Sequence, residues 1–393
     1  MSNQVDFKVE AQTLREQLVA WRRDFHMYPE LGFQETRSAS LIAERLRQLG
    51  YQVQTGVANT GVVGLLEGQG SGPVVMLRFD MDALPITEEN ETDYVSQNPG
   101  VMHACGHDAH MAMGLGVATL MARRREEIAG TLKLVFQPGE EGMNGAETMV
   151  KEGVLENPRP DVFLSTHVWN NLPVGIIGVT PGAAMAGGKK WTCTVQGQGG
   201  HGALPHQTVD PIVATAQIVT ALQTVVSRNV SPLETAVVSV GTVHGGDAFN
   251  VIPAQVEMSG TIRTYSPQVR EEVVQRVREV IEGVAAACGA TAELEIVPLT
   301  PSLINDAEVT EVVRAAAETV VGLENVVSDE RTMGSEDAAF FIREVPGCYF
   351  FLGSANAERE LNAPHHNPRF DFDEDALPLG VAIVMHALAH YLL

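Results

Sequence analysis

The sequence predicts an α/β protein in which a mostly parallel β-sheet is flanked by helices, with a second, α+β domain inserted into it. Two patterns lead to this expectation. Outside residues 186–299, apolar runs rich in β-branched residues alternate with helical segments, which is typical of parallel strands covered on both faces. Within residues 186–299 the order is β-α-β-β-α-β, which is typical of a ferredoxin-like fold. A length of 393 residues also favours more than one domain.

The first part of the interrupted domain, residues 1–185, is expected to begin with two helices and to continue as alternating strands and helices. Gly50 is a typical helix C-terminus, and the strand candidates are short and rich in β-branched residues. The expected elements are helices at 14–26 and 38–50, strands at 61–68 and 74–85, a helix at 109–125, a strand running into a turn at 131–142 and a strand at 161–168.

The inserted domain and the second part of the interrupted domain, residues 300–393, complete the expected order. The inserted elements are strands at 188–199, 235–245, 254–265 and 290–298, with helices at 209–228 and 267–289. A helix at 306–322, a strand at 347–354 and a last helix from 376 follow. The last helix is apolar, but it contains Pro378, His386 and His390 and lacks basic flanks, which favours a buried helix over a membrane span.

Charge and cysteine content narrow the functional classes. The net charge of −23 disfavours nucleic acid as a partner, because an acidic surface repels phosphate backbones. The polar start of the chain does not resemble a secretory signal. The four cysteines lie far apart and suggest no disulfide framework, so we expect a cytoplasmic protein that does not engage a membrane.

The stretch VMHACGHDAH, residues 101–110, concentrates residues that bind metals. Cys105 and His107 flank Gly106, a residue that can adopt backbone conformations closed to others. Thiolate and imidazole are ligands that zinc favours. Taken alone, the stretch fits equally well the start of a helix with a small core cysteine and unrelated histidines.

Further candidate ligands follow predicted strands. Glu140 and Glu141 are adjacent carboxylates after an apolar strand, where a cation would offset their repulsion, although a solvated acidic turn is the ordinary interpretation of such a pair. The other polar residues at strand ends or in the loop before the last helix are Asp80, Asp82, His167, His365 and His366.

Other patterns do not support a site. The sequence GQGGHG, residues 197–202, has the spacing of a dinucleotide-binding loop, but no helix opens there and no acidic residue follows at the required distance. His386 and His390 lie one helical turn apart, as a metal would require, but packing of the last helix is the favoured interpretation.

With these residues in view, the chain resembles the M20 metallopeptidases, in particular the amidohydrolases that act on N-acyl-amino acids, hippurate and indole-acetyl-amino acids. The resemblance runs nearly end to end. The segments that carry it are WRRDFHMYPELGFQE, RFDMDALPI, MHACGHDAHM, FQPGEEG, GQGGHGALPH, FNVIP, IRTY, MGSEDAAFF and HHNPRFDFDE.

The resemblance implies a zinc-exopeptidase-like catalytic domain with an inserted lid and dimerisation domain. It implies two divalent ions, zinc or manganese, with cobalt or nickel as substitutes. The implied ligands are Cys105, His107, Glu141, His167 and His366, with Cys105 bridging the ions. His366 is preferred to His365 because the family's ligand stands two residues before a proline. Glu140 would be the general base.

The resemblance also implies roles for residues of the inserted domain. His201 would reach the reaction centre, in relatives often that of a partner subunit, and Asn250 and Arg263 would bind the substrate carboxylate. Wider M20 peptidases have histidine at the position of Asp80 and an acidic residue at that of Cys105, so the roles of Asp80 and Asp82 stay open.

The expected function is therefore metal-dependent hydrolysis of small N-acyl-L-amino acids by a homodimer or homotetramer. The nearest alternative is a metallo-carboxypeptidase or dipeptidase that acts on short peptides. From a different class, the chain could be a metal-holding protein that has lost its chemistry, although the intact Glu140–Glu141 pair argues against this.

Overall fold

The computed structural model describes residues 6–393, which form two compact units. The first unit contains the chain up to Ala184 together with Ile304–Arg331 and Asp337–Leu393. The second contains Met185–Leu303 and Thr332–Glu336. Residues 1–5, which belong to the polar start of the chain, lie outside the described residues.

A large sheet forms the centre of the first unit. Its strands are β1 (Gln52–Val57), β2 (Gly61–Glu67), β3 (Gly70–Asp80), β4 (Ala129–Gln137), β5 (Val162–Pro173), β6 (Ile177–Gly178), β15 (Val326–Val327) and β16 (Gly347–Ala355). They pair in the order β1-β2-β4-β3-β5-β16-β6-β15. The neighbours β4, β3, β5 and β16 are parallel, whereas β1 and β2 pair antiparallel at one edge. The predicted α/β fold with a mostly parallel sheet is confirmed.

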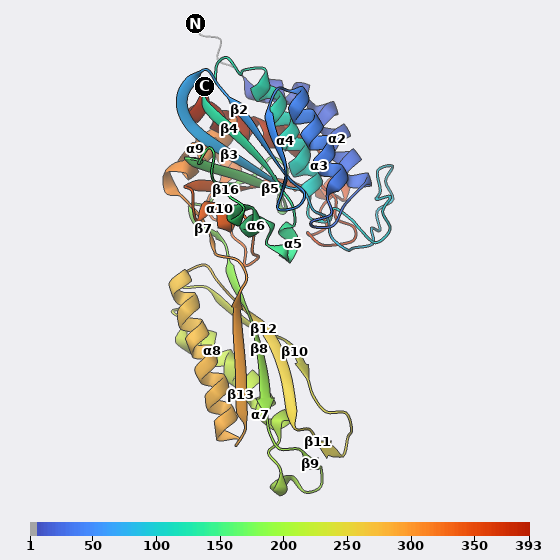
Figure 1. Ribbon diagram of the computed structural model, residues 1–393, viewed down its shortest axis with the longest axis vertical. Coiled ribbons are helices and arrows are strands. Elements are labelled where there is room, and N and C mark those ends of the chain that lie inside the picture. Colours follow the sequence, from blue (N-terminus) through green and yellow to red (C-terminus); the bar gives the residue numbers. More distant parts are fainter. Residues whose placement is uncertain (1–5) are drawn as a thin grey trace. The chain divides into compact units, whose positions relative to one another are not determined.

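Helices cover this sheet. They are α1 (Phe7–Thr13), α2 (Arg15–Met27), α3 (Thr36–Gln48), α4 (His107–Ala122), α5 (Glu140–Met143), α6 (Gly145–Lys151), α9 (Ala307–Val321), α10 (Ala339–Ile342) and α11 (Ala376–Leu392). α3 packs on β1 and β2, whereas α4 and α11 pack on β3 and β4 (Figure 1). α4 comes very close to the sheet because Gly114 has no side chain, since a Cβ there would lie 2.7 Å from the ring of Phe136.

Two details at the chain ends refine the sequence-based expectations. The N-terminal region holds three helices instead of two, because α1 forms ahead of α2 with the carboxylate of Asp6 accepting from the N–H groups of Lys8 and Val9. α11 is the expected buried helix, with most of its side chains in the core of the first unit. Within residues 6–393, no helix is both long and apolar enough to span a membrane.

The second unit is a four-stranded antiparallel sheet with two helices. In chain order its main elements are β8 (Gly187–Gln196), α7 (Pro211–Thr224), β10 (Ala236–His244), β12 (Gln255–Thr264), α8 (Pro267–Ala287) and β13 (Thr291–Pro298). The strand order is β10-β12-β8-β13, and α7 and α8 pack against each other and against this sheet. A short ribbon pairs β9 (Gly200–His201) with β11 (Val251–Ile252). Two short strands, β7 (Gly182–Met185) and β14 (Leu303–Asn305), lie where the chain passes from one unit to the other.

Candidate active site

The candidate ligands of the first unit lie at one edge of the large sheet. β3 ends at Asp80, and β4 ends just before the turn that contains Glu140 and Glu141. α4 begins at His107, and His167 lies on the neighbouring strand β5. Because parallel strands end at the same edge of a sheet, segments far apart in the sequence converge there.

Cys105, His107 and His167 form a compact group. One ligand atom from each lies within 4.8 Å of the others, and the distance from Cys105 Sγ to His167 Nε2 is 3.5 Å. The backbone between the first two requires glycine. Gly106 has φ +89°, and a Cβ there would lie 2.3 Å from the side chain of Val168. The glycine therefore allows the thiol and the first imidazole to face the same space.

Backbone carbonyls set the proton positions of both imidazoles. His107 Nδ1–H donates to the carbonyl of Asp82 at 2.9 Å, and His167 Nδ1–H donates to the carbonyl of Val168 at 2.6 Å. A carbonyl can only accept, so each Nε2 keeps its lone pair in the neutral ring. His107 Nε2 is buried and has no hydrogen-bond partner among residues 6–393. This arrangement is the one in which histidine binds a metal.

Glu141 and His366 form a second group with Cys105. His366 Nε2 lies 3.0 Å from Glu141 Oε1, and one ligand atom from each of the three residues lies within 4.8 Å of the others. His366 adopts φ +65°, and its N–H donates to the carbonyl of Ala104 at 2.8 Å. The two groups share Cys105, so each of them could hold a cation and the thiol is common to both.

The neighbouring His365 has a different environment. Its ring stacks on Trp169 with the ring centres 4.9 Å apart, and its Nε2 accepts the N–H of Asn170 at 3.2 Å. Burial lowers the pKa of His365 to about 3, and the nearby His366 adds to this. Of the two adjacent histidines, only His366 lies beside Glu141.

The turn that bears Glu140 is held from several sides. Gly139, with φ +61°, precedes it, and its N–H donates to Glu35 Oε1 at 2.9 Å. The N–H of Glu141 donates to Asp82 Oδ2 at 2.9 Å, and the N–H of Asp337 contacts Glu140 Oε1 at 3.4 Å. These contacts fix the two adjacent carboxylates in different directions, so that Glu141 faces His366 while Glu140 contacts a backbone N–H.

Asp80 and Asp82, whose roles the sequence left open, support the histidines. Asp80 accepts a hydrogen bond from Nδ1 of His110, and its other oxygen lies 2.7 Å from Arg78 Nη1. Burial alone would raise the pKa of Asp80, but Arg78, His107 and His110 hold it well below its usual value. His110 Nε2 accepts the N–H of Val168, so both of its nitrogens are already engaged.

The electrostatics of the group suit a cation. Burial raises the pKa of the Cys105 thiol well above its usual value, and the carboxylates of Glu141 and Glu140 raise it further. Burial lowers the pKa of His107, but Asp80 and Asp82 outweigh it and raise that pKa to about 10. Without a cation, this negative field opposes the thiolate, whereas a divalent ion would favour it. Soft sulfur, imidazole and carboxylate donors together fit zinc or a similar ion.

Several supporting residues were not identified from the sequence as part of the site. Arg22 of α2 is fully buried and contacts the carboxylates of Asp108, Asp371 and Glu374 at 2.9, 2.7 and 3.4 Å. Asp337 accepts hydrogen bonds from the side-chain amide of Gln137 at 2.7 and 3.0 Å. All of these residues lie in the segments that carry the family resemblance, and that resemblance was the available signal.

The remaining predicted residues belong to the second unit. His201 pairs with Val251 across the β9–β11 ribbon, and Asn250 accepts the N–H of Gly202 at 2.8 Å. These two residues are therefore neighbours. Arg263 is the ninth residue of β12, while the ribbon lies before the first residue of that strand (Figure 1). At about 3.3 Å per residue the strand alone separates the two ends by roughly 26 Å.

Comparison with known proteins identifies the family of the chain. Residues 76–390 match the model of peptidase family M20/M25/M40. The IAA-amino acid hydrolase ILR1-like 4 of Arabidopsis thaliana is 40% identical over 380 residues, covering 96% of this chain and 86% of the relative. An N-acetylcysteine deacetylase of Bacillus subtilis is 39% identical over 365 residues, covering 92% and 93%. Thermostable carboxypeptidase 1 of Saccharolobus solfataricus is 37% identical over 390 residues, covering 98% and 96%.

A solved structure is also similar over nearly the whole chain. YXEP of Bacillus subtilis, a dinuclear metal-binding peptidase of the M20 family, superposes with a TM-score of 0.85 at 34% identity, covering 96% of this chain and 98% of that one.

Proposed function

The chain belongs to peptidase family M20/M25/M40 and is a metal-dependent amidohydrolase, and we propose that it hydrolyses the amide bond of N-acyl-L-amino acids. The products are a carboxylic acid and a free amino acid. The observation that carries the proposal is a cluster of side chains of the types that bind metals, in which Cys105 belongs to two groups. The carboxylate of Glu140 lies next to that of Glu141 in this cluster. Relatives named for IAA-amino acids and N-acetylcysteine support the substrate class.

The proposed cofactor is a pair of divalent ions, zinc or manganese. The proposed ligands are Cys105, His107, Glu141, His167 and His366. When bound, the ions supply a Lewis acid that polarises the scissile carbonyl and makes the attacking water more acidic. All four cysteines are free thiols, which supports a reducing, cytoplasmic setting.

The side chains supply the proton transfers and the orientation. Glu140 takes a proton from water as the water oxygen bonds to the acyl carbon, and it delivers that proton to the amine nitrogen as the C–N bond breaks. His201 donates a hydrogen bond to the oxyanion that forms on the acyl carbonyl. Arg263 and Asn250 bind the free carboxylate of the amino acid, and the guanidinium can hold both oxygens.

We propose that the active enzyme is a homodimer or homotetramer. His201 lies on the β9–β11 ribbon, beyond the first residue of β12, whereas Arg263 lies near the other end of β12, so roughly 26 Å of strand separates them. A small N-acyl amino acid does not reach that far, so one chain cannot supply Arg263 to the same substrate as His201 and its neighbour Asn250. In a homodimer, one copy of the chain supplies Arg263 and the other supplies His201 to the same substrate. β10 is an edge strand, and no strand within residues 6–393 pairs with the side that faces away from β12. Phe249, in the loop that follows β10, is fully exposed.

A substrate panel on protein of defined metal content tests the function. N-Acetyl and N-benzoyl L-amino acids are expected to be cleaved with higher kcat/KM than free dipeptides and than the matching D-enantiomers, as measured by amine release. Faster cleavage of dipeptides or of C-terminal residues would favour the carboxypeptidase alternative, which the similarity to a thermostable carboxypeptidase supports. Absence of hydrolysis after loading with zinc, manganese or cobalt would favour a metal-holding protein without catalysis.

A second test addresses the shared ligand. Cys105→Ala is expected to lower the metal content by at least about one equivalent per chain, because the thiol belongs to both ligand groups. Elemental analysis after dialysis measures the change. Cys288→Ala is the matched control, since it removes a partly buried thiol from the second unit. Full metal retention in Cys105→Ala would remove this residue from the site.

A further inference from the structure

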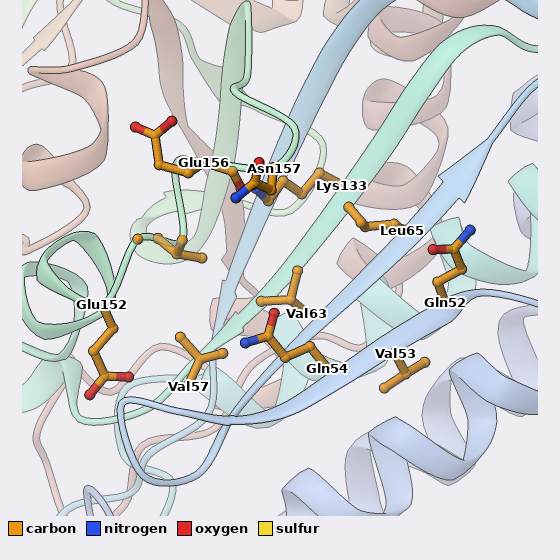
Figure 2. A pocket seen from close by; sticks show the side chains of 12 residues that line it. Gln52, Val53, Gln54, Val57, Val63, Leu65, Lys133, Glu152, Glu156 and Asn157 are labelled. Carbon is orange, nitrogen blue, oxygen red and sulfur yellow. The ribbon is translucent and has the colours of Figure 1, made fainter.

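A cavity that is separate from the candidate active site lies in the first unit, on the large sheet near its β1 edge. Its volume is about 280 Å³, close to the lower end of small-ligand pockets at about 300 Å³. One side is formed by β1, β2 and β4, and the other by residues 152–157, which follow α6 (Figure 2). It contains none of the proposed metal ligands.

Strand register explains which side chains line the cavity. Gln52, Leu65 and Lys133 are aligned across β1, β2 and β4, and Gln54 and Val63 form the adjacent row. Residues directly opposite on neighbouring strands project from the same face of a sheet. Leu65 and Val63 therefore give the cavity an apolar floor, with amide groups at the sheet edge and an ammonium group on the inner side (Figure 2).

Lys133 is a buried cation without a carboxylate partner. Its side chain is almost inaccessible, with the residue 2% exposed. Nζ donates to the carbonyls of Glu156 and Pro158, each at 2.9 Å, which leaves one of its three N–H groups free. Within residues 6–393, no carboxylate lies close enough to form an ion pair with Lys133. Burial lowers the pKa of Lys133 to about 8, and the carboxylate of Glu156 raises it without offsetting the effect of burial. A buried charge that lacks a direct ion-pair partner is costly, and an anionic ligand group in contact with it would reduce that cost.

Acidic groups line the other side of the same cavity. Glu152 uses Oε2 to accept the N–H of Ala58 at 2.6 Å, and no partner within the described chain binds Oε1. The carboxylate of Glu156 makes only a loose contact of 3.4 Å with Arg159 on the surface. A purely anionic ligand would be repelled by these two groups. A ligand with both charges would match Lys133 and the carboxylates together.

We propose that this cavity binds a free α-amino acid with an aliphatic side chain. The carboxylate of the ligand contacts Lys133, its ammonium group faces Glu152, and its side chain packs on Val63 and Leu65. The site is separate from the proposed hydrolysis and stands without it. Where N-acyl amino acids are the substrates, the ligand belongs to the same class as one product.

Equilibrium dialysis of leucine against the metal-loaded enzyme tests the site. Leucine is expected to bind, and Lys133→Met is expected to weaken this binding at least about 10-fold, since charge-assisted hydrogen bonds are strong when buried. Two analogues of leucine test the contributions of its ammonium and carboxylate groups separately. 4-Methylpentanoate lacks the amine and 3-methylbutylamine lacks the carboxylate, and each should bind more weakly than leucine. Arg263→Ala, which would affect leucine bound as a product, should leave the Lys133-dependent binding unchanged.

A second variant is needed because Lys133 also has a structural role, since its Nζ donates to the carbonyls of Glu156 and Pro158. Leu65→Trp keeps the lysine and fills the cavity with a larger side chain, and it should also abolish leucine binding. Hydrolysis without added leucine should stay at the wild-type rate in both variants. Leucine binding and hydrolysis are measured separately, so a failure of the leucine site is distinguishable from a failure of the proposed hydrolysis. Leucine binding that is unchanged in both variants, or 4-methylpentanoate binding as tightly as leucine, overturns the proposal.

Discussion

Glu140→Gln is expected to lower kcat by about 100- to 10,000-fold, the usual contribution of a positioned general base. The metal content is expected to stay unchanged. Glutamine has nearly the same shape and can still accept the N–H of Asp337, which contacts Glu140 Oε1 at 3.4 Å. It cannot take a proton from water. The turn itself is held by other groups, since Glu35 accepts the N–H of Gly139 and Asp82 accepts the N–H of Glu141.

Two further variants make this experiment decisive. Glu147→Gln is the matched control, because Glu147 is a partly exposed carboxylate paired with Lys151 one turn along α6, and its loss should not affect kcat. Glu141→Gln should instead lose metal, since its carboxylate faces His366 and Cys105. Steady-state rates and elemental analysis on the same preparations separate these effects. Wild-type turnover in Glu140→Gln would show that another group is the base.

Locally encoded features of the site could be predicted from the sequence. Cys105, Gly106 and His107 are consecutive, so a conformationally permissive glycine between two ligand-type residues was visible in the sequence, and the structure shows it in a left-handed conformation. Glu140 and Glu141 follow an apolar strand, and the carboxyl ends of parallel strands meet at one edge. The choice of His366 over its neighbour came from the family resemblance, and His366 is the one that contacts Glu141.

Long-range polar pairings could not be predicted in this way. Arg22 and Asp371 are 349 residues apart, and no local pattern marks them as partners. The role of Asp80 depends on Arg78 and His110 meeting in a dry interior, which is a property of packing. The separation of His201 from Arg263 follows from strand length and register in the second unit, and it became clear only when β12 was defined. Sequence thus indicates which residues bear chemistry, but tertiary structure determines what holds them.

The buried arginine gives the second large expected effect. Arg22 is inaccessible to solvent, and burial would lower its pKa, but Asp371 and Asp108 outweigh this and raise it well above its usual value. Its removal leaves buried carboxylates without a countercharge. Arg22→Met is therefore expected to lower the free energy of unfolding by about 3–5 kcal/mol, the range for breaking one side of a buried ion pair. Urea unfolding followed by circular dichroism measures this free energy. The dependence of the free energy of unfolding on urea concentration should have the same slope in both proteins, so that the difference reflects stability alone.

Arg23→Met provides a matched control one residue away. Arg23 pairs with Glu374 at 2.7 Å but is partly exposed, so its loss should cost only about 1 kcal/mol or less. A loss of similar size in both variants would contradict the role assigned to Arg22.

The same arginine connects stability to the proposed metal site. It binds Asp108, which follows the proposed ligand His107 at the start of α4, and Asp371, which lies five residues after the proposed ligand His366. Arg22 therefore holds together two chain segments that are distant in the sequence and that contain the proposed ligands His107 and His366. At urea concentrations where Arg22→Met is still folded, its metal affinity should be lower than that of wild type, and Arg23→Met should match wild type. Unchanged affinity in a destabilised Arg22→Met would mean that the ion network stabilises the fold without positioning the ligands.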